Sequence, residues 1–288
     1  MRLLTFRIEN GTRAGRVEGD HVVELGFSDV GDLLASGPDW RSTALTEGKL
    51  RPLAGLVFAP VVLRPPAIIC VGLNYGAHAA EAGSHVPTFP TLFAKFASSL
   101  IGAHDDLLLP AVSSEVDWEV ELAFVVGRSG RNLSRDEAQD SIAGYTVAND
   151  VSMRDWQRRT SQFLQGKSFE ASTPVGPFLV TPEELPGGSA ENLRLTCEID
   201  GIAMQDGRTS DLIFCPAALA AYVSEIMTLQ PGMLVLTGTP SGIGGSRTPP
   251  VFLRDGQIMR TTIEGIGVLE NSVRAASSPA SNRAGARG

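Results

Sequence analysis

The stretch Glu115–Gly127, which reads EVDWEVELAFVVG, constrains the fold more than any other part of the chain. It predicts a β-strand with Glu119 and Glu121 on one face, because side chains alternate across a strand. That face continues into apolar Ala123 and Val125, so we expect both carboxylates at the end of a buried face. Two like charges in such a place repel each other, and they need protonation, basic partners or a divalent cation. For Glu-x-Glu alone, two ordinary acids on a solvated face remain the alternative.

The composition predicts a globular protein rich in short strands. The 288 residues include 31 glycines and 18 prolines, and 6% are aromatic, which suits strands and turns better than a helix bundle. The net charge of −8 argues against general binding to nucleic acids or anionic membranes. No run approaches the roughly 18 apolar residues of a membrane helix. Three scattered cysteines, no CxxC and no signal-peptide pattern favour a cytoplasmic protein without a disulfide framework or zinc site.

Three parts are expected along the chain. Residues 1–62 are predicted to form a small N-terminal αβ module, and residues 63–274 the main domain. The boundary follows from Leu63–Pro66, because consecutive prolines disfavour regular structure on either side. The low-complexity residues 275–288 are predicted to be a disordered tail.

Local signals place several elements of the main domain. The range Ser134–Ser141 opens with a capping box and predicts a short helix. Asp200-Gly201 between two strand-like runs predicts a β-hairpin. Pro216–Leu229 has the apolar spacing and end signals of a helix. The basic stretch 151–170 is expected to be a loop, since clusters of basic residues are usually solvated.

His78 and Glu81 form a second pair of interest. They lie in a predicted helical turn at Ala77–Ala82, directly after a short buried strand at Ile68–Val71. Three residues apart on a helix, the two side chains share one face. A surface histidine with a neighbouring acid is the alternative interpretation.

Several motifs occur together and in order: GLNYGAHAAE, EVDWEVELAFVVG, GYTVANDVSMRDWQ, QGKSFEASTPVGPFLV and LVLTGTPSGIG. With them, the chain from about Pro65 to Arg274 resembles the fumarylacetoacetate hydrolase family, in particular its acylpyruvate hydrolase and 2-hydroxyhepta-2,4-diene-1,7-dioate isomerase-like group. The resemblance implies an α+β, β-rich fold, with a mixed β-roll or barrel around an acidic metal site. It also implies assembly as a homodimer.

The resemblance assigns a role to each matching residue. The ligands of a Mg²⁺ or Mn²⁺ ion would be Glu119, Glu121 and Asp150. An all-carboxylate set of oxygens suits such hard cations. The catalytic residues would be His78, Glu81 and Lys167. The substrate-binding residues would be Tyr75, Arg154, Gln157 and Thr239. Lys95 and Tyr75 are weaker candidates, each more consistent with a structural role.

The implied function is a metal-dependent hydrolase that cleaves a C–C bond in an acylpyruvate or diketo acid through a metal-stabilised enolate. Glu81 would orient His78, which would activate water. The alternatives on the same scaffold are an oxaloacetate decarboxylase, a 2-hydroxy-diene-dioate isomerase or a sugar-acid dehydratase, because such enolates serve all of these reactions. From another class, the chain could be a non-catalytic binding protein. The expected partner is a small keto acid, with no nucleic acid and no membrane.

Overall fold

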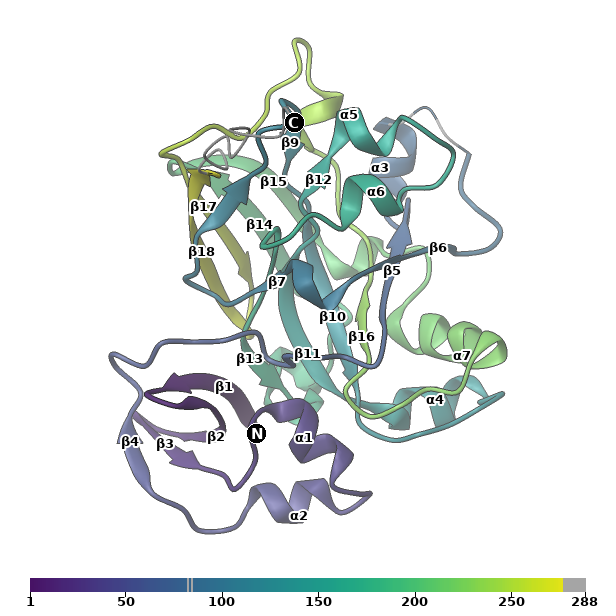
Figure 1. The fold of residues 1–288 in the computed structure, drawn as a ribbon. Helices are drawn as coiled ribbons and strands as arrows, with labels where there is room; N and C mark the ends of the chain where they lie inside the picture. The colour runs from purple at the N-terminus through teal and green to yellow at the C-terminus, as the bar shows by residue number, and fades with distance from the viewer. Residues whose placement is uncertain (82, 84, 277–288) are drawn as a thin grey trace, which may run out of the picture.

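The computed structural model describes residues 1–81, 83 and 85–276, and the side chains of residues 78–80 lie outside the described part (Figure 1). The predicted α+β, β-rich fold is confirmed. Eleven strands form one mixed sheet, five form a second sheet and two form a short ribbon. The large sheet runs in the order β4-β3-β2-β1-β13-β11-β10-β16-β5-β6, with β7 beside β13. It has two separate ends, β4 and β6, and does not close into a barrel.

The N-terminal residues form one end of the large sheet. Their elements are β1 (Arg2–Ile8), β2 (Gly11–Glu18), β3 (His21–Glu24), α1 (Val30–Ala35), α2 (Trp40–Ala44) and β4 (Leu50–Pro52). At the start of helix α1, the Asp29 side chain accepts a hydrogen bond from the Asp32 N–H. Strand β1 pairs with β13, so this sheet is continuous with the main domain. The division near residue 63 stays a prediction.

The centre of the large sheet is buried on both faces. Its strands are β5 (Ile68–Gly72), β6 (Thr91–Lys95), β7 (Leu100–Ile101), β10 (Val120–Val126), β11 (Ile142–Asn149), β13 (Thr173–Val180) and β16 (Leu234–Leu236). Every residue of β10 and β11 is buried. The predicted strand over Glu115–Gly127 is interrupted: β9 (Val116–Asp117) pairs with β12 (Ser152–Met153), and β10 begins only at Val120. The chain therefore changes partner strand at Trp118 and Glu119.

The second sheet contains the predicted hairpin. Its strands are β8 (Leu107–Leu109), β14 (Arg194–Ile199), β15 (Ile202–Arg208), β17 (Ile258–Ile263) and β18 (Gly267–Ala275). Asp200 and Gly201 join β14 to β15 with φ values of 51° and 77°, as a two-residue turn of this kind requires. Strand β18 includes Ala275, the first residue of the predicted tail, and residues 277–288 lie outside the described residues.

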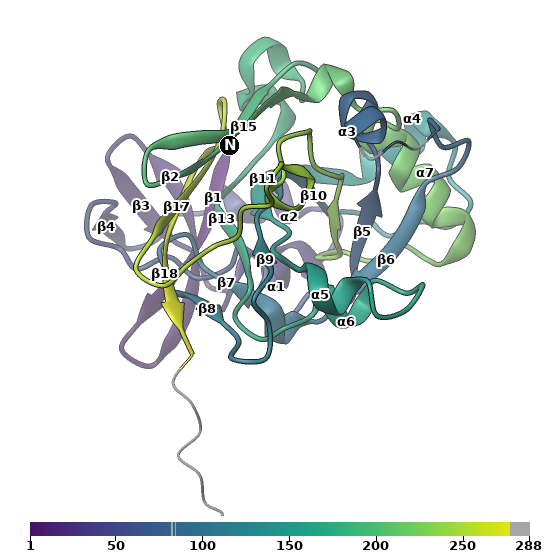
Figure 2. The same ribbon diagram turned by 90° about the horizontal axis from the view of Figure 1, so that it is seen from above.

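The longer helices cover the side of the molecule away from the N-terminal module. They are α4 (Arg135–Ser141), which has the predicted capping box, and α7 (Pro216–Ile226). Figures 1 and 2 both show α7 on the side opposite strands β2 to β4. Within the described ranges, none of the helices combines the length and apolar character needed to cross a bilayer.

The stretch 151–170, predicted to be a loop, contains two short helices, α5 (Arg154–Gln157) and α6 (Leu164–Lys167). They lie side by side in both views. A Cβ atom on Gly166 would lie 2.4 Å from the backbone nitrogen of Gln157, so the two helices approach backbone to backbone. This tertiary packing, which the basic composition does not reveal, stabilises helical turns too short to persist alone.

Candidate active site

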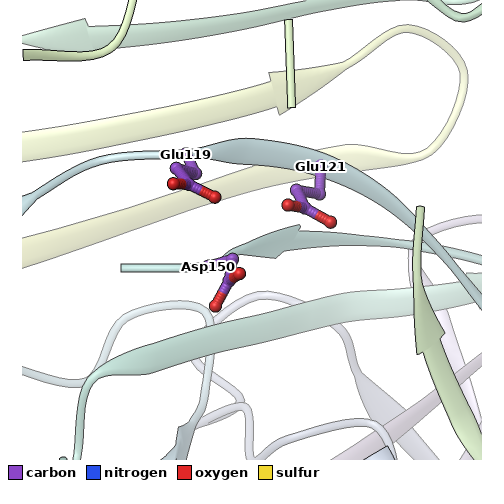
Figure 3. Close-up of side chains that lie close together, drawn as sticks. All are labelled: Glu119, Glu121 and Asp150. Atoms are coloured by element: carbon purple, nitrogen blue, oxygen red, sulfur yellow. The ribbon is translucent and has the colours of Figure 1, made fainter. Parts of the chain in front are cut away.

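Three buried carboxylates meet where strands β10 and β11 begin and end. Glu119, Glu121 and Asp150 each offer an oxygen atom, and these oxygens all lie within 4.8 Å of one another (Figure 3). Val120 pairs with Asn149, which brings the start of one strand beside the end of the other. The Asp150 N–H also donates to the Glu119 carbonyl at 2.8 Å. The grouping predicted from the sequence is therefore present in the structure.

Buried cations surround two of the three carboxylates. Lys167 Nζ donates to Glu119 Oε2 at 2.8 Å and to Asp150 Oδ2 at 2.7 Å. Lys95 Nζ donates to Asp150 Oδ1 at 2.6 Å. Arg154 NH1 lies 2.7 Å from Glu119 Oε1. Although burial acts to lower it, the pKa of Lys167 is raised by the charges of Asp150 and Glu119, so this lysine stays protonated.

Glu121 has a different environment. Its Oε2 accepts a hydrogen bond from the Gly238 N–H at 2.7 Å, and among the described residues no lysine or arginine forms a salt bridge with it. Burial, together with the charges of Asp150 and Glu119, raises the pKa of Glu121 well above its usual range. The site thus holds one carboxylate whose charge the protein does not neutralise directly.

The charge balance and donor types of the site fit a hard divalent cation. Four buried carboxylates, those of the group and Asp117, face three buried cations, Lys95, Arg154 and Lys167. One net negative charge remains when all four carboxylates are ionised. Carboxylate oxygens alone are the ligands that magnesium and manganese prefer, and they are poor matches for zinc.

A cavity of about 140 Å³ opens beside the carboxylates. Its polar wall is formed by Glu119, Arg154, Gln157, Lys167 and Thr239. Its apolar wall contains Val71, Leu73, Phe93 and Phe163. The structure therefore brings together the three-carboxylate group, the predicted catalytic lysine and three of the four predicted substrate-binding residues. Their roles toward a substrate stay predictions.

Thr239 and Tyr75 differ in how their hydroxyl groups are used. Thr239 Oγ1 donates to the Val120 carbonyl at 2.8 Å and accepts from Gln205 Nε2 at 2.8 Å, so its proton is already committed. The Tyr75 hydroxyl is buried and has no hydrogen-bond partner in the structure. Burial raises the pKa of Tyr75, and the charges of Glu121 and Asp211 raise it further.

The predicted histidine–glutamate pair is described only in part. Its backbone belongs to α3 (Gly76–Glu81), close to the predicted helical turn. Glu81 Oε1 accepts a hydrogen bond from the Gly242 N–H at 3.0 Å, which places this helix against the loop that follows β16. The side chain of His78 lies outside the described residues, so its pairing with Glu81 stays a prediction.

Two residues of the site received little weight from the sequence. Lys95 was expected to be structural, yet it is buried against a proposed metal ligand. Asp117, inside the EVDWEVEL motif, bonds to Arg154 Nε at 2.8 Å. The available signals were Lys95 in a mostly apolar strand and Asp117 as a third acid beside Glu-x-Glu. Neither signal shows which acidic residue pairs with which basic residue.

The chain is similar to several known proteins. The family model described as fumarylacetoacetate (FAA) hydrolase C-terminal matches residues 67–274. The chain is 44% identical to human mitochondrial oxaloacetate tautomerase FAHD2A over 224 residues, 77% of this chain and 71% of that protein. Two solved structures are similar over 96% of this chain and all of theirs. They are a 5-carboxymethyl-2-hydroxymuconate delta-isomerase from Mycobacterium smegmatis (33% identity, TM-score 0.79) and a fumarylacetoacetate hydrolase from Exiguobacterium antarcticum (30% identity, TM-score 0.84).

Proposed function

The chain belongs to the fumarylacetoacetate hydrolase family, and from this premise we propose that it is a metal-dependent hydrolase of an acylpyruvate or related diketo acid. Mg²⁺ or Mn²⁺ would be held by Glu119, Glu121 and Asp150. The observation that carries the proposal is a buried three-carboxylate group that opens on a small cavity lined by Lys167 and Arg154. The cavity volume of about 140 Å³ favours a compact substrate.

Electrostatics support an anionic 2-oxo acid as the substrate. When bound, a divalent cation would supply Lewis-acid stabilisation of negative charge on the 2-oxo oxygen of the substrate. With all four carboxylates ionised and the cation bound, the site would carry one net positive charge, which attracts a carboxylate. Lys167 adds a permanent positive charge beside the reacting atoms, and Arg154 NH2, buried without a partner, is free to receive a carboxylate oxygen.

The proposed hydrolysis requires water and a base. Glu81, fixed by the Gly242 N–H, would hold His78, whose imidazole would take a proton from water. The water oxygen would bond to the distal carbonyl carbon, and the bond between that carbon and the pyruvate methylene carbon would break. The electron pair would stay on the pyruvate unit as an enolate, which regains the proton. The products are a carboxylic acid and pyruvate.

A keto–enol tautomerase of a 2-oxo dicarboxylate is the second candidate. The 44% identity to a protein named oxaloacetate tautomerase favours it. This reaction forms a related enolate and needs only proton transfers, one at the enol oxygen and one at the neighbouring carbon, with no attack by water. It therefore depends on the cation site and Lys167, and does not need the hydrolytic use of His78.

The deciding experiment measures three reactions with Mg²⁺, with Mn²⁺ and with EDTA. The first is the cleavage of acetylpyruvate, monitored by the acetate that is released. The second is the enol-to-keto conversion of oxaloacetate, and the third is the release of CO₂ from oxaloacetate. We expect metal-dependent acetate release that is lost in H78A and kept in H104A, a matched change of an exposed histidine. Oxaloacetate tautomerisation that survives H78A, without acetate release, would replace the hydrolase by the tautomerase. CO₂ release alone would indicate a decarboxylase.

A further inference from the structure

Asp117 is a fully buried carboxylate outside the three-carboxylate group, and it does not line the cavity. Both of its oxygens accept hydrogen bonds. Oδ1 accepts from the backbone N–H groups of Trp118 at 2.8 Å and Gly244 at 2.7 Å. Oδ2 accepts from the Gly245 N–H at 2.8 Å and from Arg154 Nε at 2.8 Å. Four donors therefore converge on one side chain.

These donors come from separate parts of the site. Asp117 ends β9, two residues before Glu119, and Arg154 begins α5. The two glycines belong to the single-turn helix η5 (Gly244–Ser246), on the same loop as Thr239. One carboxylate thus connects the segment with a proposed metal ligand, the helix with a proposed substrate-binding arginine, and the loop after β16.

The glycine pair is shaped to this carboxylate. A Cβ atom on Gly244 would lie 1.9 Å from the Val251 carbonyl oxygen and 2.8 Å from Asp117 Oδ1. A Cβ atom on Gly245 would lie 3.2 Å from Asp117 Oδ2. Because glycine has no side chain, both N–H groups can approach the carboxylate. Glycine is favoured at these two positions by the lack of space for a Cβ atom and not by the backbone dihedral angles.

The contacts of Arg154 show what the arrangement achieves. Its Nε donates to Asp117, and NH1 donates to Gln157 Oε1 at 2.9 Å and pairs with Glu119. NH2 is buried and has no hydrogen-bond partner among the described residues, and Arg154 lines the cavity. Because two edges of the planar guanidinium are held by charged hydrogen bonds, the third group cannot turn away without breaking them.

We propose that Asp117 is a positioning residue that fixes Arg154, so that its free NH2 group receives the carboxylate of a 2-oxo acid. The inference rests on the proposed function only in taking the ligand to be such an anion. Without the Asp117 carboxylate, Arg154 would retain Glu119 as its main charged partner, and the guanidinium would turn toward the metal group and away from the cavity. Asp117 therefore acts on ligand affinity through Arg154.

The test is the binding of pyruvate, which needs no turnover, to the Mg²⁺-loaded protein by titration calorimetry. D117N keeps the shape but replaces an acceptor oxygen by an NH₂ group that faces two donors. We expect the pyruvate Kd to rise about tenfold, the loss of roughly one charged hydrogen bond, with less than about threefold change in the Mg²⁺ Kd. R154Q should weaken pyruvate binding similarly, and the double variant D117N/R154Q should be no weaker than R154Q alone.

The matched control is D206N, which breaks the exposed pair of Arg194 with Asp206, and it should leave the pyruvate Kd unchanged. Additive effects of D117N and R154Q, an unchanged pyruvate Kd in D117N, or no pyruvate binding by the wild type would each overturn the proposal. If D117N does not fold, G245A decides: a raised pyruvate Kd supports the proposal, and an unchanged one refutes it. Absence of acylpyruvate turnover would refute only the proposed reaction.

Discussion

Replacing Glu121 by glutamine is expected to stabilise the metal-free protein while abolishing tight binding of a divalent cation. The change keeps the size of the side chain and the hydrogen bond from the Gly238 N–H, which a glutamine oxygen can also accept. It removes a buried negative charge that neighbours Asp150 and Glu119 repel. The carboxylate is therefore retained at a cost to stability, which is consistent with a role as a metal ligand.

The magnitude follows from proton linkage. The pKa of Glu121 is raised above its ordinary value of 4.5, so the folded state keeps a proton that the unfolded state loses above that pH. The free energy of unfolding then falls as pH rises, by at most about 1.4 kcal/mol per pH unit, until the pH passes the folded-state pKa. Between pH 5.0 and 7.5 this group can cost at most about 3.4 kcal/mol. E121Q removes this pH dependence. Relative to the wild type, its free energy of unfolding should therefore increase by up to about 3.4 kcal/mol between pH 5.0 and 7.5.

The glutamine substitution of Glu119, two residues earlier, is the matched comparison, because it should change stability in the opposite direction. Glu119 pairs with Lys167 and Arg154, so E119Q removes one of the two charged partners of each of these buried cations, leaving Asp150 for Lys167 and Asp117 for Arg154. It should destabilise the metal-free protein by about 3 kcal/mol. Urea unfolding in EDTA at pH 5.0 and 7.5 measures both variants. Equal destabilisation by E121Q and E119Q at pH 7.5, or a wild-type pH slope that E121Q leaves unchanged, would refute the charge assignment of this site.

Three further outcomes are expected. K95M removes the donor 2.6 Å from Asp150 Oδ1, so the free energy of unfolding in EDTA should fall by about 3 kcal/mol. The Mg²⁺ affinity measured by calorimetry should increase, because the site is more negative without this lysine. Because the pKa of Glu121 is raised, Mg²⁺ binding should release protons from it at pH values below its folded-state pKa, and the Mg²⁺ affinity should rise there by up to about tenfold per pH unit, measured by calorimetry in buffers of different ionisation enthalpy. G201A should lower the free energy of unfolding by about 1 kcal/mol, measured with urea, because φ is 77° there although nothing lies within 4 Å of the added Cβ.

The elements that the sequence predicted well have signals confined to a few neighbouring residues. The helix at α4 has its capping box, and the turn at Asp200-Gly201 joins β14 and β15 in the predicted hairpin. The acidic pair on one strand and Asp150 at the end of another also follow from strand periodicity and order along the chain. For these features, local physics and the tertiary structure agree.

The features that were missed depend on contacts between distant segments. The helices α5 and α6 are stabilised by packing against each other, and the break at Trp118 arises because β9 pairs with β12 and not with β11. The pairing of Lys95 with Asp150 joins residues 55 positions apart, so no local pattern predicts it. The homodimer, the cytoplasmic location and the identity of the cation also stay predictions, and the relative FAHD2A is named as mitochondrial.

The layout of the site separates the part that stabilises charge from the part that selects the reaction. The carboxylate group, Lys95 and Lys167 are fixed by the buried strands and by α6, and with the proposed cation bound they would stabilise negative charge on a 2-oxo acid in each of the proposed reactions. The pair that would activate water, His78 and Glu81, belongs to α3, and the apolar wall of the cavity contains Phe93 and Phe163. Relatives named as a tautomerase, an isomerase and a hydrolase share this fold, which is what such a division allows. Changes at α3 or the cavity wall can therefore redirect the reaction without rebuilding the charge balance of the buried centre.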